Sequence, residues 1–188
     1  IEFITLVFAL LRAGAVQILI DPGMGRKHLL NCLCEAEPTG FVTIPRGQVV
    51  RAIFRRWFPL AKWNITVGRK LWPGWWSLDE IRRLGETTVV NSTVATNLCH
   101  KALPHTVAND PAAIIFTTGS TGPPKGVLYR YGNFDRQVAE IQAQYQIQPG
   151  EIDVPCFPLF GLFNAAMGVT TVLPVMDFSR PAACDPRR

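Results

Sequence analysis

Short apolar runs and amphipathic segments alternate along most of this 188-residue chain. Apolar periodicity and capping signals predict helices over residues 1–13, 26–35, 48–58, 77–85 and 134–148. Short apolar or β-branched runs predict strands over residues 16–20, 41–44, 112–116, 127–131, 153–157 and 168–173. Because helices and strands alternate, we expect an α/β fold with a mostly parallel sheet and flanking helices.

Local signals refine three of the predicted helices. Ser77 followed by Glu80 is typical of a capping box, which starts a helix. Asn133 has a side chain suited to capping the last long helix. The helix over residues 48–58 carries its apolar positions on one side: Val49, Ile53 and Trp57.

A basic, tryptophan-rich stretch occupies the first half of the chain. Residues 59–76 lack periodicity, and the chain's five tryptophans lie in or beside them: Trp57, Trp63, Trp72, Trp75 and Trp76. Seven cations contribute to a net charge of +5: Arg46, Arg51, Arg55, Arg56, Lys62, Arg69 and Lys70. The stretch is either a hydrophobic surface that meets lipid or an acyl chain, or a flap packed by its own aromatics beside a solvated basic helix face. No regular aromatic or helix-turn-helix pattern supports a nucleic-acid partner.

Residues 154–176 are 23 residues without a charge, which is long enough to span a bilayer. They contain Pro155, Pro158 and Pro174, and prolines at this spacing interrupt a helix repeatedly. We therefore expect buried strands and a short helix here instead of a membrane span.

Composition favours a globular chain, with 48% hydrophobic and 18% charged residues. The five cysteines and three histidines show no metal-ligand or disulfide spacing, so we predict no metal site. The chain begins with Ile1 inside an apolar run and stops just after a loop. We therefore expect residues 1–188 to be an incomplete domain, truncated at both ends.

The chemistry is concentrated where the strand over residues 112–116 ends. It is followed by Thr117-Thr118-Gly119-Ser120-Thr121-Gly122-Pro123-Pro124-Lys125-Gly126. Glycines let backbone N–H groups approach anionic oxygens, the hydroxyls add donors, and Lys125 adds a positive charge. The segment therefore predicts a phosphate-binding loop.

Two common phosphate-binding motifs do not fit this loop. The nucleoside triphosphatase P-loop requires glycine where Pro124 stands, and Ser or Thr where Gly126 follows the lysine. The dinucleotide fingerprint requires a Gly-x-Gly opening, which the loop lacks.

Residues 117–126 resemble the AMP-binding signature of the adenylate-forming superfamily, which includes acyl-CoA synthetases, luciferase-like enzymes and peptide-synthetase adenylation domains. The flanks agree, because residues 11–15 with Asp21-Pro22 and residues 157–160 resemble the family's neighbouring motifs. The resemblance implies that residues 1–188 are part of the large N-terminal domain.

The resemblance also implies a reaction. These enzymes join a carboxylate to ATP, with Mg²⁺, to form an acyl adenylate and pyrophosphate. The implied ATP phosphate-binding residues are Thr117, Thr118, Gly119, Ser120, Thr121, Gly122 and Lys125. The family's adenine-binding motifs and its C-terminal domain with the adenylation lysine are not among these 188 residues. We therefore assign no catalytic residue here and expect the 188 residues alone to be inactive.

Residues 128–134, 157–164 and 177–181 are similar to the OleC-type olefin β-lactone synthetases. That resemblance implies a 2-alkyl-3-hydroxy fatty acid as substrate, closed to a β-lactone without coenzyme A. Phe160 and Gly161 are the implied acyl-site residues. Gly161 stands where many ligases carry His, which either opens space for a branched substrate or eases backbone packing.

Two other functions stay open at this stage. One is a long-chain fatty acyl-CoA ligase on the same scaffold, and the other is a noncatalytic lipid- or membrane-binding module. We expect a cytoplasmic protein whose partners are a fatty-acid-type substrate, a peripheral membrane surface and other enzymes of hydrocarbon biosynthesis.

Overall fold

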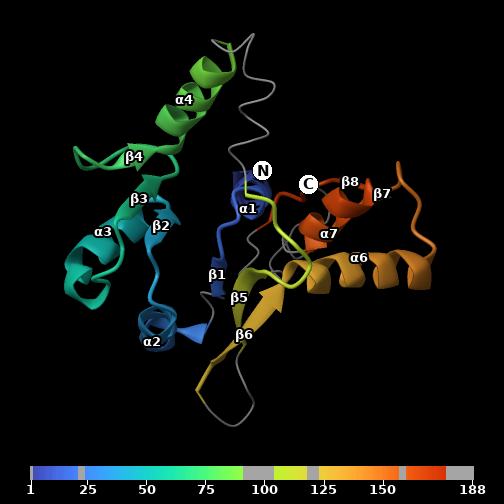
Figure 1. Cartoon of the computed structure of the whole chain (residues 1–188), viewed down its shortest axis with the longest axis horizontal. Helices are drawn as coiled ribbons and strands as arrows, with labels where there is room; N and C mark the ends of the chain where they lie inside the picture. Colours follow the sequence, from blue (N-terminus) through green and yellow to red (C-terminus); the bar gives the residue numbers. More distant parts are fainter. Residues whose placement is uncertain (1, 21–23, 91–103, 118–122, 157–159, 177–188) are drawn as a thin grey trace. The chain divides into compact units, whose positions relative to one another are not determined.

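The computed structural model describes residues 2–20, 24–90, 104–117, 123–156 and 160–176 (Figure 1). The chain divides into two compact units. Unit 1 consists of residues 1–17, 105–113 and 128–188, and unit 2 of residues 18–104 and 114–127. Each unit is described by itself below.

Helix α1 (Glu2–Arg12) opens unit 1, as the apolar spacing predicts. It ends where expected, because Gly14 has a φ of 69° and its N–H donates to the carbonyl of Leu11. Val7 is the buried residue of the helix, and its carbonyl accepts a 3.0 Å hydrogen bond from Gln17 Nε2. This bond ties the helix to the strand that follows.

A three-stranded sheet has the order β1-β5-β6, formed by β1 (Gln17–Ile20), β5 (Pro111–Thr117) and β6 (Lys125–Arg130). The predicted buried strand before the signature is confirmed, because Ala112, Ala113 and Phe116 are all buried. The division between the units passes through all three strands.

Strand β6 leads directly into helix α6 (Tyr131–Tyr145) (Figure 1). The predicted N-cap at Asn133 is wrong by three residues, since Arg130 is the N-cap and Tyr131 is helical. Asn133 Oδ1 instead accepts a 2.8 Å hydrogen bond from the backbone N–H of Arg130. The asparagine therefore caps the helix from inside its first turn. The helix also ends earlier than predicted, at Gln146 in the left-handed conformation.

The last elements of unit 1 are short. Strands β7 (Ile152–Asp153) and β8 (Thr170–Thr171) pair in parallel, and helix α7 (Phe160–Met167) lies between them in sequence. Among the described residues of the predicted strands over 153–157 and 168–173, only Asp153 and Thr170–Thr171 are in strands. Buried Asn164 donates a 2.7 Å hydrogen bond to Asp153 Oδ2, which fixes α7 to β7.

Unit 2 contains a parallel sheet with helices. Its elements are α2 (Arg26–Ala36), β2 (Gly40–Thr43), α3 (Pro45–Ile53), the 3₁₀ turn η2 (Arg55–Trp57), β3 (Trp63–Thr66), β4 (Trp76–Ser77) and α4 (Leu78–Val90). The sheet order is β2-β3-β4, and both pairs are parallel. Together with the β7–β8 pair, this confirms the predicted α/β fold with parallel pairing.

Three predictions for unit 2 need correction. The segment over residues 59–76 is not irregular throughout, since β3 lies within it. The helix predicted over residues 48–58 begins at Pro45, where proline suits the first helical position, and stops at Ile53. The predicted capping box at Ser77 is confirmed by reciprocal bonds of 3.1 and 2.7 Å with Glu80, but α4 continues beyond Gly85.

Helix α3 turns its polar side inward. Gln48 is 0% exposed, and its Nε2 donates a 2.8 Å hydrogen bond to the carbonyl of Ile65 in β3. Arg51 Nη2 likewise donates to the carbonyl of Ala61 at 2.8 Å. The apolar side faces outward, with Ile53 70% and Val50 46% exposed. This arrangement reverses the usual packing of an amphipathic helix.

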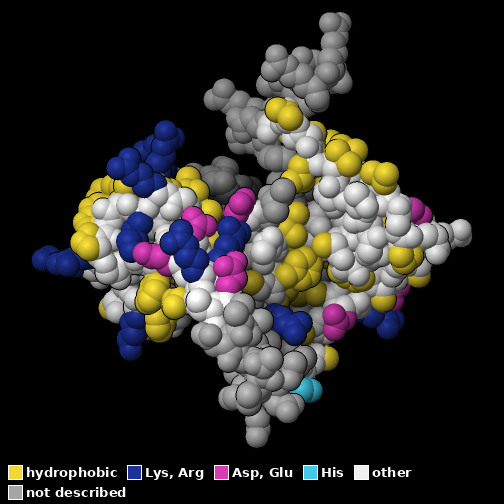
Figure 2. Space-filling model, turned by 90° about the horizontal axis from the view of Figure 1, so that it is seen from above, with side chains coloured by type: hydrophobic (Ala, Val, Ile, Leu, Met, Phe, Trp, Pro, Cys, Tyr) yellow, Lys and Arg dark blue, Asp and Glu magenta, His cyan; other side chains and the backbone are white. Residues whose placement is uncertain are grey.

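Figure 2 shows yellow hydrophobic side chains beside dark blue Lys and Arg side chains on one face of the molecule. Among the described residues, no helix combines the length and the apolar character that crossing a bilayer requires.

Candidate functional site

Thr117 and Lys125 stand at the two ends of the signature loop. Thr117 is the last residue of β5, and Lys125 is the first residue of β6. These strands are neighbours in the sheet, and the seven residues 118–124 connect them. A connection this short suits an antiparallel pair, because a parallel crossover needs about a dozen residues or more. Thr117 and Lys125 therefore lie at the same end of this strand pair.

Gly126 permits close contact between the two strands. A Cβ atom at this position would lie 3.1 Å from Ile114 Cγ2 and 3.1 Å from Phe116 Cζ. A larger residue would require the Ile114 and Phe116 side chains to shift. The glycine after Lys125 in the signature thus has a packing role, while the lysine beside it keeps its side chain in solvent.

Both described phosphate-binding candidates are exposed. In the part of the chain that the structure describes, no acidic group forms an ion pair with Lys125. An exposed ammonium group without a carboxylate partner can meet an anion without first breaking an internal salt bridge. The other predicted residues of the loop lie outside the described residues: Thr118, Gly119, Ser120, Thr121 and Gly122.

The acyl-site candidates lie at the start of α7, in unit 1. Phe160 is 57% exposed and Gly161 is buried. A Cβ at Gly161 would lie 3.1 Å from Ile4 Cδ1 and 3.6 Å from Thr171 Cγ2. The space beside this glycine is therefore occupied by Ile4 of α1. Of the two explanations offered for Gly161, this contact favours backbone packing.

The segment over residues 128–134 serves the junction between β6 and α6. The rings of Tyr129 and Phe134 stack with centroids 5.3 Å apart. The Tyr131 hydroxyl donates a 2.6 Å hydrogen bond to the carbonyl of Leu11, and burial, with a smaller effect of Asp110, raises the pKa of this phenol. A Cβ at Gly132 would lie 3.1 Å from Ala108 Cβ. Sequence reasoning used these residues only as a resemblance, whereas the structure gives them contacts across unit 1.

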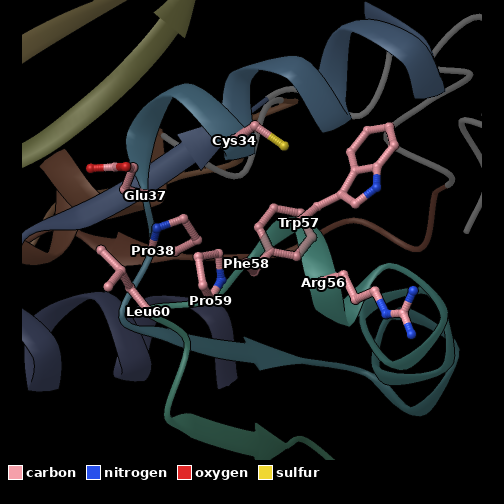
Figure 3. A pocket seen from close by; sticks show the side chains of 8 residues that line it. All are labelled: Cys34, Glu37, Pro38, Arg56, Trp57, Phe58, Pro59 and Leu60. Atoms are coloured by element: carbon pink, nitrogen blue, oxygen red, sulfur yellow. The ribbon is translucent and has the colours of Figure 1, made fainter.

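A pocket of about 310 Å³ lies in unit 2, and none of its lining residues is a predicted site residue (Figure 3). The end of α2 and the segment that begins at η2 form its walls: Cys34, Glu37, Pro38, Arg56, Trp57, Phe58, Pro59 and Leu60. Periodicity did not reveal it, because its residues come from two separate segments of the chain, 34–38 and 56–60. Within the described ranges, no three His, Cys, Asp or Glu side chains come together as a metal site.

Comparison with known proteins assigns the family. Residues 1–175 match the family described as AMP-binding enzyme. The chain therefore belongs to the AMP-binding enzyme family, as the signature predicts.

Two curated relatives are olefin β-lactone synthetases. The protein from Xanthomonas campestris and that from Stenotrophomonas maltophilia are each 43% identical over 187 residues, which is 100% of this chain. The chain spans about a third of the length of these relatives, 32% in each case.

Solved structures agree on the fold. An apo structure of MbtA from Mycobacterium smegmatis matches 97% of this chain and 33% of its own, with a TM-score of 0.69 and 21% identity. An inhibitor-bound N-terminal domain of FACL13 from Mycobacterium tuberculosis matches 95% of this chain and 43% of its own, with a TM-score of 0.64 and 19% identity. At these identities the likeness concerns the fold alone.

Proposed function

We propose that this chain is part of the large N-terminal domain of an ATP-dependent olefin β-lactone synthetase. The observation that carries the proposal is the 43% identity to two such synthetases along the whole chain. The exposed residues Thr117 and Lys125, at the two ends of the signature loop, support it. The substrate would be a 2-alkyl-3-hydroxy fatty acid, as in hydrocarbon biosynthesis.

The proposed reaction has two steps. A carboxylate oxygen of the fatty acid attacks the α-phosphorus of ATP, and the bond to the bridging oxygen breaks, so that pyrophosphate leaves. The substrate's 3-hydroxyl oxygen then attacks the acyl carbon. Its proton passes to a base, AMP leaves, and the four-membered lactone closes.

Residues of the signature would act on the leaving pyrophosphate. Lys125 contributes a positive charge, and Thr117, Thr118, Ser120 and Thr121 contribute hydroxyl donors. Backbone N–H groups from Gly119 to Gly122 would complete the anion site. Mg²⁺ bound to the phosphate oxygens would neutralise further charge. Because ATP is a cytoplasmic substrate, the proposal includes a cytoplasmic location.

Product analysis of the full-length protein tests the proposal. The protein is incubated with ATP, Mg²⁺ and a 2-alkyl-3-hydroxy fatty acid, with and without coenzyme A, and products are identified by mass spectrometry. We expect a β-lactone, AMP and pyrophosphate without coenzyme A. The matched 2-alkyl acid that lacks the 3-hydroxyl should give an adenylate but no lactone. A thioester formed only with coenzyme A would instead identify a fatty acyl-CoA ligase, and no pyrophosphate release would refute adenylation.

A further inference from the structure

The exposed residues of α3 and of η2, which follow one another in unit 2, make up what we call the α3–η2 face. Its helical members recur at spacings of three and four residues, so they share one side of the helix. All seven of its residues are exposed: Arg46, Val49, Val50, Ile53, Arg55, Arg56 and Trp57. The face thus combines three aliphatic side chains, one indole and three guanidinium groups.

This polarity follows from how α3 docks on its sheet. Gln48 and Arg51 hold the helix by hydrogen bonds to backbone carbonyls of the β3 region. Gly47 lies against Thr43, where an added Cβ would come within 2.1 Å of the threonine Oγ1. Because polar and small residues occupy the inner side of α3, its aliphatic residues Val49, Val50 and Ile53 stay exposed. A surface of this kind indicates contact with an apolar partner.

The segment that carries this face has charges of one sign, although Glu37 at the end of α2 lines a pocket together with Arg56 and Trp57. Residues 38–78 contain no Asp or Glu, while seven Lys and Arg and all five tryptophans of the chain lie within them. In the described residues, Arg46, Arg55 and Arg56 form no ion pair with a carboxylate. These cations are therefore available to an anionic partner.

Aromatic residues extend the apolar part of the face. Trp57 packs edge-on against Phe54, with ring centroids 5.3 Å apart, and keeps half of its surface exposed. Trp57 also lines the pocket of Figure 3, together with Phe58, Pro59 and half-exposed Leu60. Indole rings favour the boundary between headgroups and acyl chains, because they have an apolar body and a polar N–H.

We propose that the α3–η2 face binds the surface of an anionic lipid bilayer. The arginines would meet lipid phosphates, and Val50, Ile53 and Trp57 would enter the boundary between headgroups and acyl chains. This binding site is separate from the signature residues and does not depend on the proposed reaction. It would hold the enzyme at the phase where long-chain acids and their apolar products accumulate.

Vesicle sedimentation with the full-length protein tests this site. We expect binding to vesicles of phosphatidylcholine with 25% phosphatidylglycerol, weak binding to pure phosphatidylcholine, and release by 0.5 M NaCl. The double variant R55Q/R56Q should weaken binding roughly 30-fold, since each cation near an anionic surface contributes about fivefold. The matched double variant R26Q/K27Q, at two exposed cations of α2, should bind like the wild type.

A second pair of variants tests the apolar contribution. Ile53→Ser should weaken vesicle binding about tenfold, because a buried aliphatic side chain is lost from the lipid boundary. Ile152→Ser is the control, since Ile152 of unit 1 is 72% exposed against 70% for Ile53. Pyrophosphate exchange without vesicles should be unchanged in all four variants, so failure of lipid binding and failure of the proposed reaction are distinguishable.

Several results would overturn the lipid site. Absence of wild-type binding to anionic vesicles is one, and wild-type binding by folded R55Q/R56Q is another. If Ile53→Ser lowers the melting temperature as much as a core substitution, the rest of the polypeptide covers the face. If it instead dissociates a dimer in size-exclusion chromatography, a second copy covers it.

Discussion

Residues 111–134 and residues 45–66 each contain strand and helix, but they differ in how many polar side chains they bury. In the first segment, β5 buries Ala112, Ala113 and Phe116. In the second, the buried side chains are Gln48, Phe58, Ala61, Asn64 and Thr66, of which three are polar. Apolar periodicity therefore predicts that a helix exists more reliably than it predicts which side faces inward. Where backbone carbonyls lie beside a helix, amide and guanidinium donors can occupy its inner side.

The largest expected effect concerns the signature in the first segment. Lys125→Ala in the full-length enzyme should lower the rate of ATP–pyrophosphate exchange by about 10²–10³-fold, because a positive charge on the leaving pyrophosphate is lost. Lys27→Ala, at an exposed cation of α2, is the control and should retain the wild-type rate. A K125A rate within twofold of wild type would remove this lysine from the proposed chemistry.

The polar docking of α3 gives the next largest effect. Gln48→Ala should lower the free energy of unfolding by about 2–3 kcal/mol, because the Ile65 carbonyl loses its donor and a buried side chain is truncated. Ile53→Ala, on the exposed side of the same helix, should cost less than about 0.5 kcal/mol. Urea denaturation of both variants measures the difference. The reverse order would show that the apolar side carries the packing after all.

Close packing at the β6–α6 junction can be tested at Gly132. Gly132→Ala should destabilise the protein by about 1–3 kcal/mol, because the new methyl group would press on Ala108 of the facing turn. Gly85→Ala in α4 is the control, since an added Cβ there meets nothing within 4 Å and alanine favours a helix. Equal melting temperatures for G132A and wild type would contradict the contact.

The smallest effect concerns the polar contacts of Glu80 at the start of α4. A hydrogen bond from Lys70, at 2.6 Å, and one from the Ser77 backbone hold the pKa of Glu80 below its ordinary value of 4.5. Because the folded-state pKa is lowered, this stabilisation is complete above pH 4.5 and is lost as the pH falls through the folded-state value. The stability difference between wild type and Glu80→Gln should therefore disappear under acid, as measured by denaturant unfolding at several pH values. A difference that does not change with pH would exclude the charge as its source.

Sequence rules correctly predicted the structural features that depend only on residues adjacent in the chain. The Gly14 terminus, the Ser77 capping box and the buried strand before Thr117 all followed from a few adjacent side chains. The start of α6 was misplaced because Asn133 can cap a helix from its third position as well as from its boundary. β3 was missed because Asn64 and Thr66 are polar, although both are buried in the sheet. For the candidate site, the sequence motif predicted Lys125. The proximity of Gly161 to Ile4 could not be predicted, because no local pattern connects these two residues.

The hydrogen bond between Tyr131 and Leu11 also constrains folding during translation. Its partners are 120 residues apart in the sequence. At a synthesis rate of about 5–20 residues per second, roughly 6–24 seconds pass between the synthesis of Leu11 and that of Tyr131. The contact that anchors α1 to α6 therefore becomes available only after the 120 positions that separate its partners have been synthesised.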